Sequence, residues 1–160
     1  MKITSKSPEV SIITVGMNHL VLLKELLQSL YIVSKPKVTF EFVYVDNCSS
    51  DGSVEYIRDN FKDVIVIINE TVKGFAENNN IGVENSVGKY IAIINPDVVI
   101  LDGAIDKLVT FKKSRTDVGI IIPKLLNSDL TLQYSARRFI TLKSLFYRVI
   151  FNGNDNASSN

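Results

Sequence analysis

An Asn-Pro-Asp tripeptide, Asn95-Pro96-Asp97, directly follows a short apolar run and holds the side chains best suited to chemistry in this 160-residue chain. A carboxylate such as that of Asp97 can hold Mg²⁺ or Mn²⁺, and a cation held in this way can neutralise negative charge on a bound ligand. Pro96 fixes its own φ and lacks a backbone donor, which suits a strand end that turns into a ligand loop. The alternative is a simple turn without a ligand.

A second polar pair, Asp46-Asn47, follows another apolar run. The Asp46 carboxylate can accept a hydrogen bond from the imide N–H of uracil or thymine. It can also simply cap the next turn, because Asp and Asn favour turns at strand ends. The Asn47 side chain has the same two alternatives.

The segment KGFAENNNIGV adds further candidates. We expect Gly74 to take a backbone conformation closed to other residues and Gly82 to let a helix pack closely on a sheet. The amides of Asn79 and Asn80 can each both donate and accept hydrogen bonds. Lys73 can approach a phosphate, although an isolated loop lysine is more often solvated.

Repeated apolar runs indicate the elements that must position these residues. Runs that are short, rich in β-branched residues and nearly continuously apolar are typical of strands covered on both faces, and they occur at 10–15, 39–45, 64–68 and 90–94, with a further strand expected at 118–122. Apolar residues at helical spacing predict helices over 20–30, 54–61, 74–86 and 102–113. Asn18 is the expected N-cap of the first helix and Asp102 that of the last.

The alternation of strands and helices predicts an α/β fold with a doubly wound, mostly parallel sheet and helices on both faces. Such sheets bind ligands in the crevice beyond the carboxyl ends of their strands. The two polar clusters, at 46–47 and 95–97, both follow strand ends. A shared pocket is therefore expected at that edge.

Length and composition narrow the class further. The length suits one domain, expected over 1–151, with a disordered tail at 152–160. A net charge of +1 offers no case for nucleic acid binding. Cys48 is the sole cysteine, and we see neither a secretory signal nor a membrane-spanning run. A cytoplasmic protein is expected.

Five ordered motifs carry a family resemblance: VSIITVGMN, VYVDNCSSDGS, NETVKGFAENNNIGV, GKYIAIINPDVVI and PKLLNSDLTLQYSARR. Together they resemble family 2 glycosyltransferases of the rhamnosyltransferase-like branch. The resemblance implies the Rossmann-like GT-A fold and the inverting transfer of a sugar, rhamnose or another hexose, from a nucleoside diphosphate sugar. The implied acceptor is a glycan or a lipid-linked glycan, and the implied pathway is polysaccharide biosynthesis.

The resemblance also implies roles for single residues. Asp97 would hold the divalent cation, Mg²⁺ or Mn²⁺, while Asn95 stands where many members have an acid. The implied donor-binding residues are Val15, Asn18, Asp46, Asn47, Gly74, Asn79, Asn80, Asn95, Asp97 and Arg137. The general base of the family comes from a downstream segment, so no catalytic base is assigned.

Two alternatives remain open from the sequence. The chain can be a non-catalytic nucleotide-sugar-binding module, or a donor-binding subunit that needs a second domain or chain. The basic, amphipathic segment 139–151 can pack on protein or make a peripheral contact with an anionic membrane surface, and we favour packing.

Overall fold

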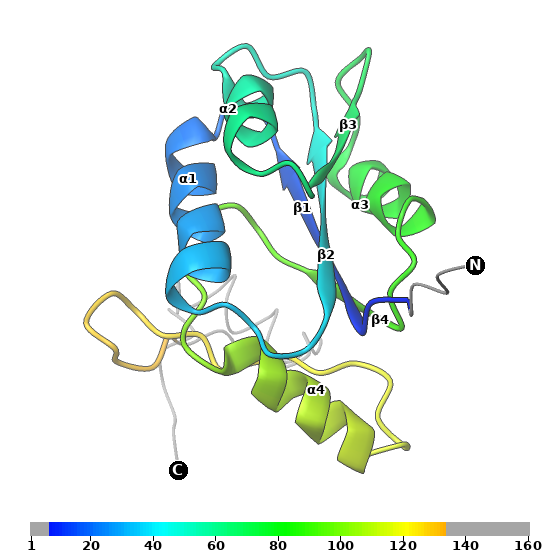
Figure 1. The fold of residues 1–160 in the computed structure, drawn as a ribbon, viewed down its shortest axis with the longest axis vertical. Coiled ribbons are helices and arrows are strands. Elements are labelled where there is room, and N and C mark those ends of the chain that lie inside the picture. The colour runs from blue at the N-terminus through cyan, green and yellow to red at the C-terminus, as the bar shows by residue number, and fades with distance from the viewer. Residues whose placement is uncertain (1–6, 134–160) are drawn as a thin grey trace, which may run out of the picture. The chain divides into compact units, whose positions relative to one another are not determined.

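The computed structural model describes residues 7–133, which fall into two compact units that divide after Ile121. The first unit holds every helix and strand of the described chain (Figure 1). In chain order these are β1 (Val10–Gly16), α1 (Leu20–Gln28), the π-helical turn η1 (Ser29–Val33), β2 (Phe40–Asp46), α2 (Ser53–Asn60), β3 (Ile65–Ile68), α3 (Phe75–Glu84), β4 (Tyr90–Ile93) and α4 (Ala104–Ser114).

The four strands form one parallel sheet in the order β3-β2-β1-β4. The chain lays β2 and β3 on one side of β1 and then crosses back to place β4 on its other side. The register pairs Gly16 with Asp46, so β1 and β2 end level with each other. The direction of winding reverses at β1, and such a switch point opens a crevice at the carboxyl ends of the strands.

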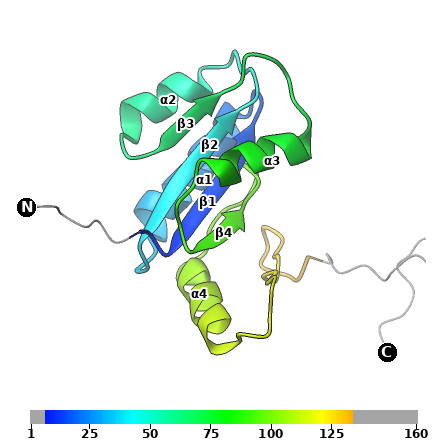
Figure 2. The same ribbon diagram turned by 90° about the vertical axis from the view of Figure 1, so that its right-hand side faces the viewer.

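Helices cover both faces of this sheet, as predicted. On one face Leu23, Leu26 and Leu27 of α1 pack with Phe42 and Tyr44 of β2 in the main core. That core also holds Ile57 of α2 and Ile105 and Val109 of α4. Helix α3 lies on the opposite face, where it crosses β1 and β2 (Figures 1 and 2).

Glycine allows α3 to approach the sheet closely. A Cβ atom added to Gly82 would lie 2.4 Å from Cγ2 of Ile13 and 3.4 Å from Cγ2 of Val45. Carbon atoms in contact normally stay about 3.5–4.0 Å apart. The helix therefore packs at a distance that no larger residue permits, as the sequence predicted for Gly82.

The predicted strand at 118–122 is wrong. These residues form no strand with any part of the chain that the structure describes, and Ile120 and Ile122 are exposed. A β-branched run becomes a strand only where another strand accepts its backbone hydrogen bonds. Local sequence does not specify that partner.

The two predicted helix caps are also wrong. Helix α1 begins after His19, and α4 begins after Gly103, which has a φ of 67°. Neither Asn18 nor Asp102 caps the helix that follows it. The backbone N–H of Leu20 instead donates to Oδ2 of Asp51, 2.7 Å away, so a distant loop supplies an acceptor for the first N–H group of α1.

The described part of the second unit, residues 122–133, forms a tight turn closed by an antiparallel bridge between Leu126 and Leu132. The Asp129 carboxylate accepts hydrogen bonds from the hydroxyl and the backbone N–H of Thr131, and these bonds lower its pKa.

No helix among residues 7–133 is both long and apolar enough to cross a membrane. Arg137, the segment 139–151 and the tail 152–160 lie outside the described residues.

Candidate functional site

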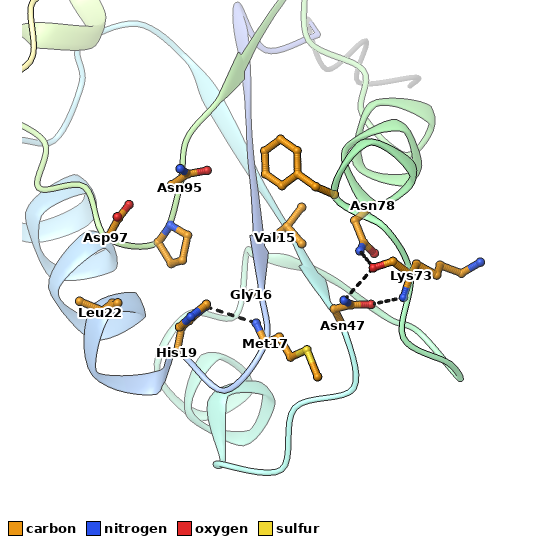
Figure 3. Close-up of a pocket in the computed structure, with 12 residues that line it drawn as sticks. Val15, Gly16, Met17, His19, Leu22, Asn47, Lys73, Asn78, Asn95 and Asp97 are labelled. Carbon is orange, nitrogen blue, oxygen red and sulfur yellow. Dashed lines mark hydrogen bonds between the residues drawn. The ribbon is translucent and has the colours of Figure 1, made fainter. Parts of the chain in front are cut away.

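A cavity of about 340 Å³ opens at the carboxyl end of the sheet, at the switch point beside β1. Its walls come from the ends of β1, β2 and β4, the first turns of α1 and α3, and the loop before α3 (Figure 3). The lining residues are Val15, Gly16, Met17, His19, Leu22, Asn47, Lys73, Phe75, Asn78, Asn95, Pro96 and Asp97.

The end of β4 brings Asn95 and Asp97 to the cavity. The backbone N–H of Ile94 donates to the carbonyl of Ile13, and the Thr14 hydroxyl donates to the carbonyl of Ile94, 2.8 Å away. The chain therefore leaves the sheet beside β1, and Asn95-Pro96-Asp97 begins the loop at its end. Both Asn95 and Asp97 are exposed.

The Asp97 carboxylate has no hydrogen bond or ion pair with any residue between 7 and 133, so it is free to bind a cation there. The described residues hold no group of three or more His, Cys, Asp or Glu side chains arranged to bind a metal. A single carboxylate nevertheless fits Mg²⁺ or Mn²⁺, because such ions take much of their coordination from substrate phosphates and water.

Asp46 has a different environment. It is only 1% exposed and does not line the cavity. Its Oδ2 accepts the backbone N–H of Ser49 at 2.9 Å, and the Tyr44 hydroxyl donates to its Oδ1 at 3.4 Å. Asp46 thus caps the turn, which is the alternative that the sequence left open. Contact with a base stays a prediction.

Tyr44 explains why β1 ends in glycine. Its hydroxyl oxygen would lie 2.3 Å from a Cβ atom on Gly16, so only glycine leaves room for the ring. Burial, with a smaller contribution from the Asp46 carboxylate, raises the pKa of Tyr44 to about 12. The phenol is therefore neutral at physiological pH and serves as a hydrogen-bond donor to Asp46.

The loop after β2 is tied to the loop after β1. The Asn18 backbone N–H donates to Oγ of Ser49, and Oδ1 of Asn18 accepts the N–H of Ser50 at 2.8 Å. Asn18, with a φ of 56°, therefore holds two loops together and does not line the main cavity. It borders a second hollow of about 300 Å³ with His19, Leu20, Val21, Leu22 and Asp51.

Asp51 anchors this pair of loops. Besides Leu20, it accepts the hydroxyl and the backbone N–H of Ser53, at 2.6 and 3.1 Å. Burial opposes ionisation of the carboxyl, but these hydrogen bonds outweigh it and hold the pKa of Asp51 below its usual value.

Asn47 lines the cavity, yet its amide is largely committed to the loop before α3. Its Oδ1 accepts the backbone N–H of Lys73 at 2.9 Å, and its Nδ2 donates to the Lys73 carbonyl at 3.1 Å. The same Oδ1 accepts Nδ2 of Asn69 at 3.1 Å. Asn47 therefore shapes the wall of the cavity at least as much as it faces a ligand.

The asparagine run in α3 is divided by the helical period. Asn78 and Asn79 share the sheet-facing side with Gly82 and are buried, whereas Asn80 is exposed. Asn78 lines the cavity, but Asn79 donates to the Phe75 carbonyl and neither it nor Asn80 lines the cavity. The spacing of four and three residues to Gly82 is the signal in the sequence for the burial of Asn78 and Asn79, but it does not tell which of the two lines the cavity.

Gly74 precedes α3 with a φ of −71° and a ψ of 160°, which any residue can adopt. The expectation of a conformation reserved for glycine is wrong there, because the helix starts from extended backbone. Lys73 lines the cavity, but its side chain is paired with a neighbour in α3. Its Nζ lies 2.5 Å from Oε1 of Glu77, and Figure 3 shows the side chain running away from Asp97.

His19 and Phe75 are lining residues that sequence reasoning missed. The Nδ1 atom of His19 accepts the Met17 N–H at 3.4 Å, so a neutral ring carries its proton on Nε2. Phe75 is 67% exposed at the first position of α3. A single exposed aromatic or histidine has no sequence signature, because only the meeting of loops makes it part of a wall.

Four predicted residues thus meet at one cavity: Val15, Asn47, Asn95 and Asp97. Five others support the surrounding loops or lie away from it: Asn18, Asp46, Gly74, Asn79 and Asn80. Arg137 lies outside the described residues. The roles of all ten in binding stay predictions.

The fold and the cavity define a ligand-binding α/β protein with a parallel sheet, and a family model narrows this class. The model of glycosyl transferase family 2 matches residues 11–158, and the chain therefore belongs to glycosyl transferase family 2. A comparison with curated protein sequences gave no match.

Solved structures show the same fold. The chain resembles TarS 1–349 of S. aureus with a TM-score of 0.60 at 20% identity, over 72% of this chain and 38% of that one. It resembles TarS 1–349 in complex with UDP-GlcNAc with a TM-score of 0.57 at 21% identity, over 66% of this chain and 31% of that one. It also resembles the mannosyltransferase PcManGT of Pyrobaculum calidifontis in complex with GDP-Man and Mn²⁺, with a TM-score of 0.52 at 23% identity, over 66% of this chain and 31% of that one.

At these identities the likeness concerns the fold, which is the GT-A fold. The chain spans about a third of the length of these solved structures.

Proposed function

We propose that this chain binds a nucleoside diphosphate sugar in the cavity at the end of β1 and β4, as the donor-binding half of an inverting glycosyltransferase. The observation that carries the proposal is the exposed carboxylate of Asp97, which has no partner among the described residues, at the switch point of a family 2 chain. The complexes of the similar proteins with UDP-GlcNAc and with GDP-Man and Mn²⁺ support it by analogy.

In the proposed reaction an acceptor hydroxyl oxygen attacks the anomeric carbon and forms the new glycosidic bond. The bond from that carbon to the diphosphate oxygen breaks, and the nucleoside diphosphate leaves with the electron pair. The hydroxyl proton passes to a general base, which we do not assign to any residue. The divalent cation supplies charge neutralisation at the diphosphate when it is bound.

We assign each cavity residue a role in donor binding from the chemistry of its side chain and from its hydrogen bonds. Asp97 would hold the cation, and the amide of Asn95 would contact the ribose or sugar. The Nε2 proton of a neutral His19 is available to a diphosphate oxygen, because Nδ1 already accepts the Met17 N–H. The apolar residues Val15 and Met17 suit the nucleoside.

The sugar, the nucleotide and the acceptor are assigned from the sequence motifs. We propose a deoxyhexose such as rhamnose, carried on dTDP, UDP or GDP, and a glycan or lipid-linked acceptor in polysaccharide assembly. A binding module that performs no transfer is the competing proposal.

A thermal-shift panel of nucleoside diphosphate sugars, run with and without Mn²⁺, tests donor binding. We expect a rise in melting temperature that needs Mn²⁺ and depends on the base. No shift with any donor would contradict the proposal. Release of nucleoside diphosphate in the presence of an acceptor would distinguish transfer from binding alone.

A further inference from the structure

Three buried asparagine side chains from three separate parts of the chain meet at one wall of the cavity. Asn47 follows β2, Asn69 follows β3 and Asn78 lies in the first turns of α3, and their exposed fractions are 7%, 8% and 1%. Nδ2 of Asn69 donates to Oδ1 of Asn47 at 3.1 Å and to Oδ1 of Asn78 at 2.5 Å. We call these three residues the amide network.

The amide network is directed at one short piece of backbone. Nδ2 of Asn78 donates to the carbonyls of Lys73 and Gly74, both at 3.1 Å. Asn47 binds both the N–H and the carbonyl of Lys73. Four hydrogen bonds from amide side chains therefore meet at Lys73 and Gly74, the two residues that precede Phe75. Two further hydrogen bonds, both donated by Asn69, align Asn47 and Asn78 within the network.

Burial makes this arrangement specific. A buried amide that loses its partner retains its full desolvation cost, so each member is held in one orientation by the others. Within the described residues no buried side-chain nitrogen or oxygen lacks a hydrogen bond. The hydrogen bonds of the amide network are therefore satisfied without a ligand, and they fix the position of the loop before α3.

Phe75 is the residue that this position controls. It follows Gly74 directly, lines the cavity and leaves 67% of its surface in solvent. An exposed aromatic ring has a hydration cost that a stacked ligand removes, and base–aromatic stacking is tolerant of base identity. The ring shares the cavity with the apolar Val15 and Met17, whereas Asp97 and Asn95 enter from the end of β4.

We infer that Phe75 is a ligand-contact residue that stacks on the base of the donor, and that Asn69 and Asn78 are positioning residues that act through Asn47 and Lys73 to hold it there. This inference rests on the proposed function, because it assigns part of the same donor site. We assign the stacked group to the base and not the sugar, because only the base offers a planar π-face to the ring, and because the carboxylate that would hold the diphosphate comes from the loop after β4 and not from α3.

The test measures binding of UDP, GDP and dTDP to the full chain by calorimetry in Mn²⁺, and continues with the diphosphate that binds wild type best. Phe75→Ala should weaken binding roughly tenfold, while Phe75→Tyr keeps the stacking face and should restore it. Phe111→Ala, which removes a half-exposed ring from α4, is the matched control and should bind as wild type.

The positioning role is tested by a double-mutant cycle. Asn78→Ala should weaken binding severalfold, but the Phe75→Ala, Asn78→Ala double variant should bind no more weakly than Phe75→Ala alone. Asn85→Ala is the control, because Asn85 also donates to a helix carbonyl, that of Ile81, but lies at the far end of α3. If Asn78→Ala does not fold, Asn69→Ala enters the same cycle.

The outcomes separate the two proposals. Normal wild-type binding with unchanged affinity in Phe75→Ala would overturn the inference and leave the proposed function standing. Additive losses in the double variant would overturn the positioning role. A loss seen with a nucleoside diphosphate sugar but not with the free diphosphate would overturn the assignment to the base. Failure of wild type to bind any of the three diphosphates would overturn both proposals.

Discussion

Replacing Gly82 by alanine tests whether the spacing between α3 and the sheet is as close as the structure shows. The new Cβ atom would lie 2.4 Å from Cγ2 of Ile13, which is fully buried at the centre of the sheet. Carbon atoms in contact settle at about 3.5–4.0 Å, so the helix or Ile13 must move by about 1 Å.

The magnitude follows from two opposing terms. Overpacking of this kind costs about 1–3 kcal/mol, and a central strand position belongs at the upper end. Alanine is favoured over glycine in a helix by about 1 kcal/mol. We therefore expect Gly82→Ala to lower the free energy of unfolding by about 2 kcal/mol and the melting temperature by about 4–8 °C in a chain of this length.

Chemical denaturation and thermal melting of the variant provide the measurement. Gly119→Ala is the matched control, because no atom lies within 4 Å of a Cβ atom at that glycine, and its stability should equal that of wild type. In a Gly82→Ala, Ile13→Ala double variant the new methyl group occupies space that Ile13 vacates, so the loss should be smaller than the sum of the single losses. A Gly82→Ala variant as stable as wild type, or strictly additive losses, would refute the close approach.

Three further changes concern the carboxylates. Asp97→Asn should abolish the Mn²⁺-dependent part of donor affinity in calorimetry and leave the melting temperature unchanged, because that carboxylate has no partner among residues 7–133; unchanged affinity in Mn²⁺ would contradict its role. Asp46→Ala should instead lower the free energy of unfolding by about 1–3 kcal/mol in urea, because Tyr44 and Ser49 lose a buried acceptor; full stability would show that the turn does not need it. Asp51→Asn should lower the free energy of unfolding at neutral pH. Because folding lowers the pKa of Asp51, the difference in unfolding free energy between wild type and variant should stay constant above about pH 5 and shrink as the pH falls below the ordinary pKa of 3.8. A difference that grows in acid would show that folding raises this pKa.

Much of the fold could be predicted because it depends on local pattern. The apolar runs at 10–15, 39–45, 64–68 and 90–94 match the four observed strands to within one or two residues. Continuous β-branched runs flanked by polar turns are unambiguous when both faces of a strand are covered. The run at 118–122 has the same composition but forms no strand in the described structure, since strand formation needs a neighbouring edge.

The helix ends and the site show where local reasoning stops. Asn18 precedes a helix and is a good capping residue, yet Asp51 supplies the acceptor for that helix from another loop. Among the three adjacent asparagines of α3, the helical phase relative to Gly82 buries Asn78 and Asn79 and exposes Asn80. The identity of the residues was available from the sequence, but their partners were not.

By itself, the sequence determined the strand and helix pattern, the parallel class of the sheet, and the edge at which polar side chains gather. These properties depend on periodicity and on the rule that parallel strands present their carboxyl ends together. Only the tertiary structure decided which of those side chains line the cavity. Asp97 is exposed and has no partner among residues 7–133, whereas Asp46 is buried and accepts the backbone N–H of Ser49. The physical reason is that a buried carboxylate must find hydrogen-bond donors within the fold, whereas an exposed one need not.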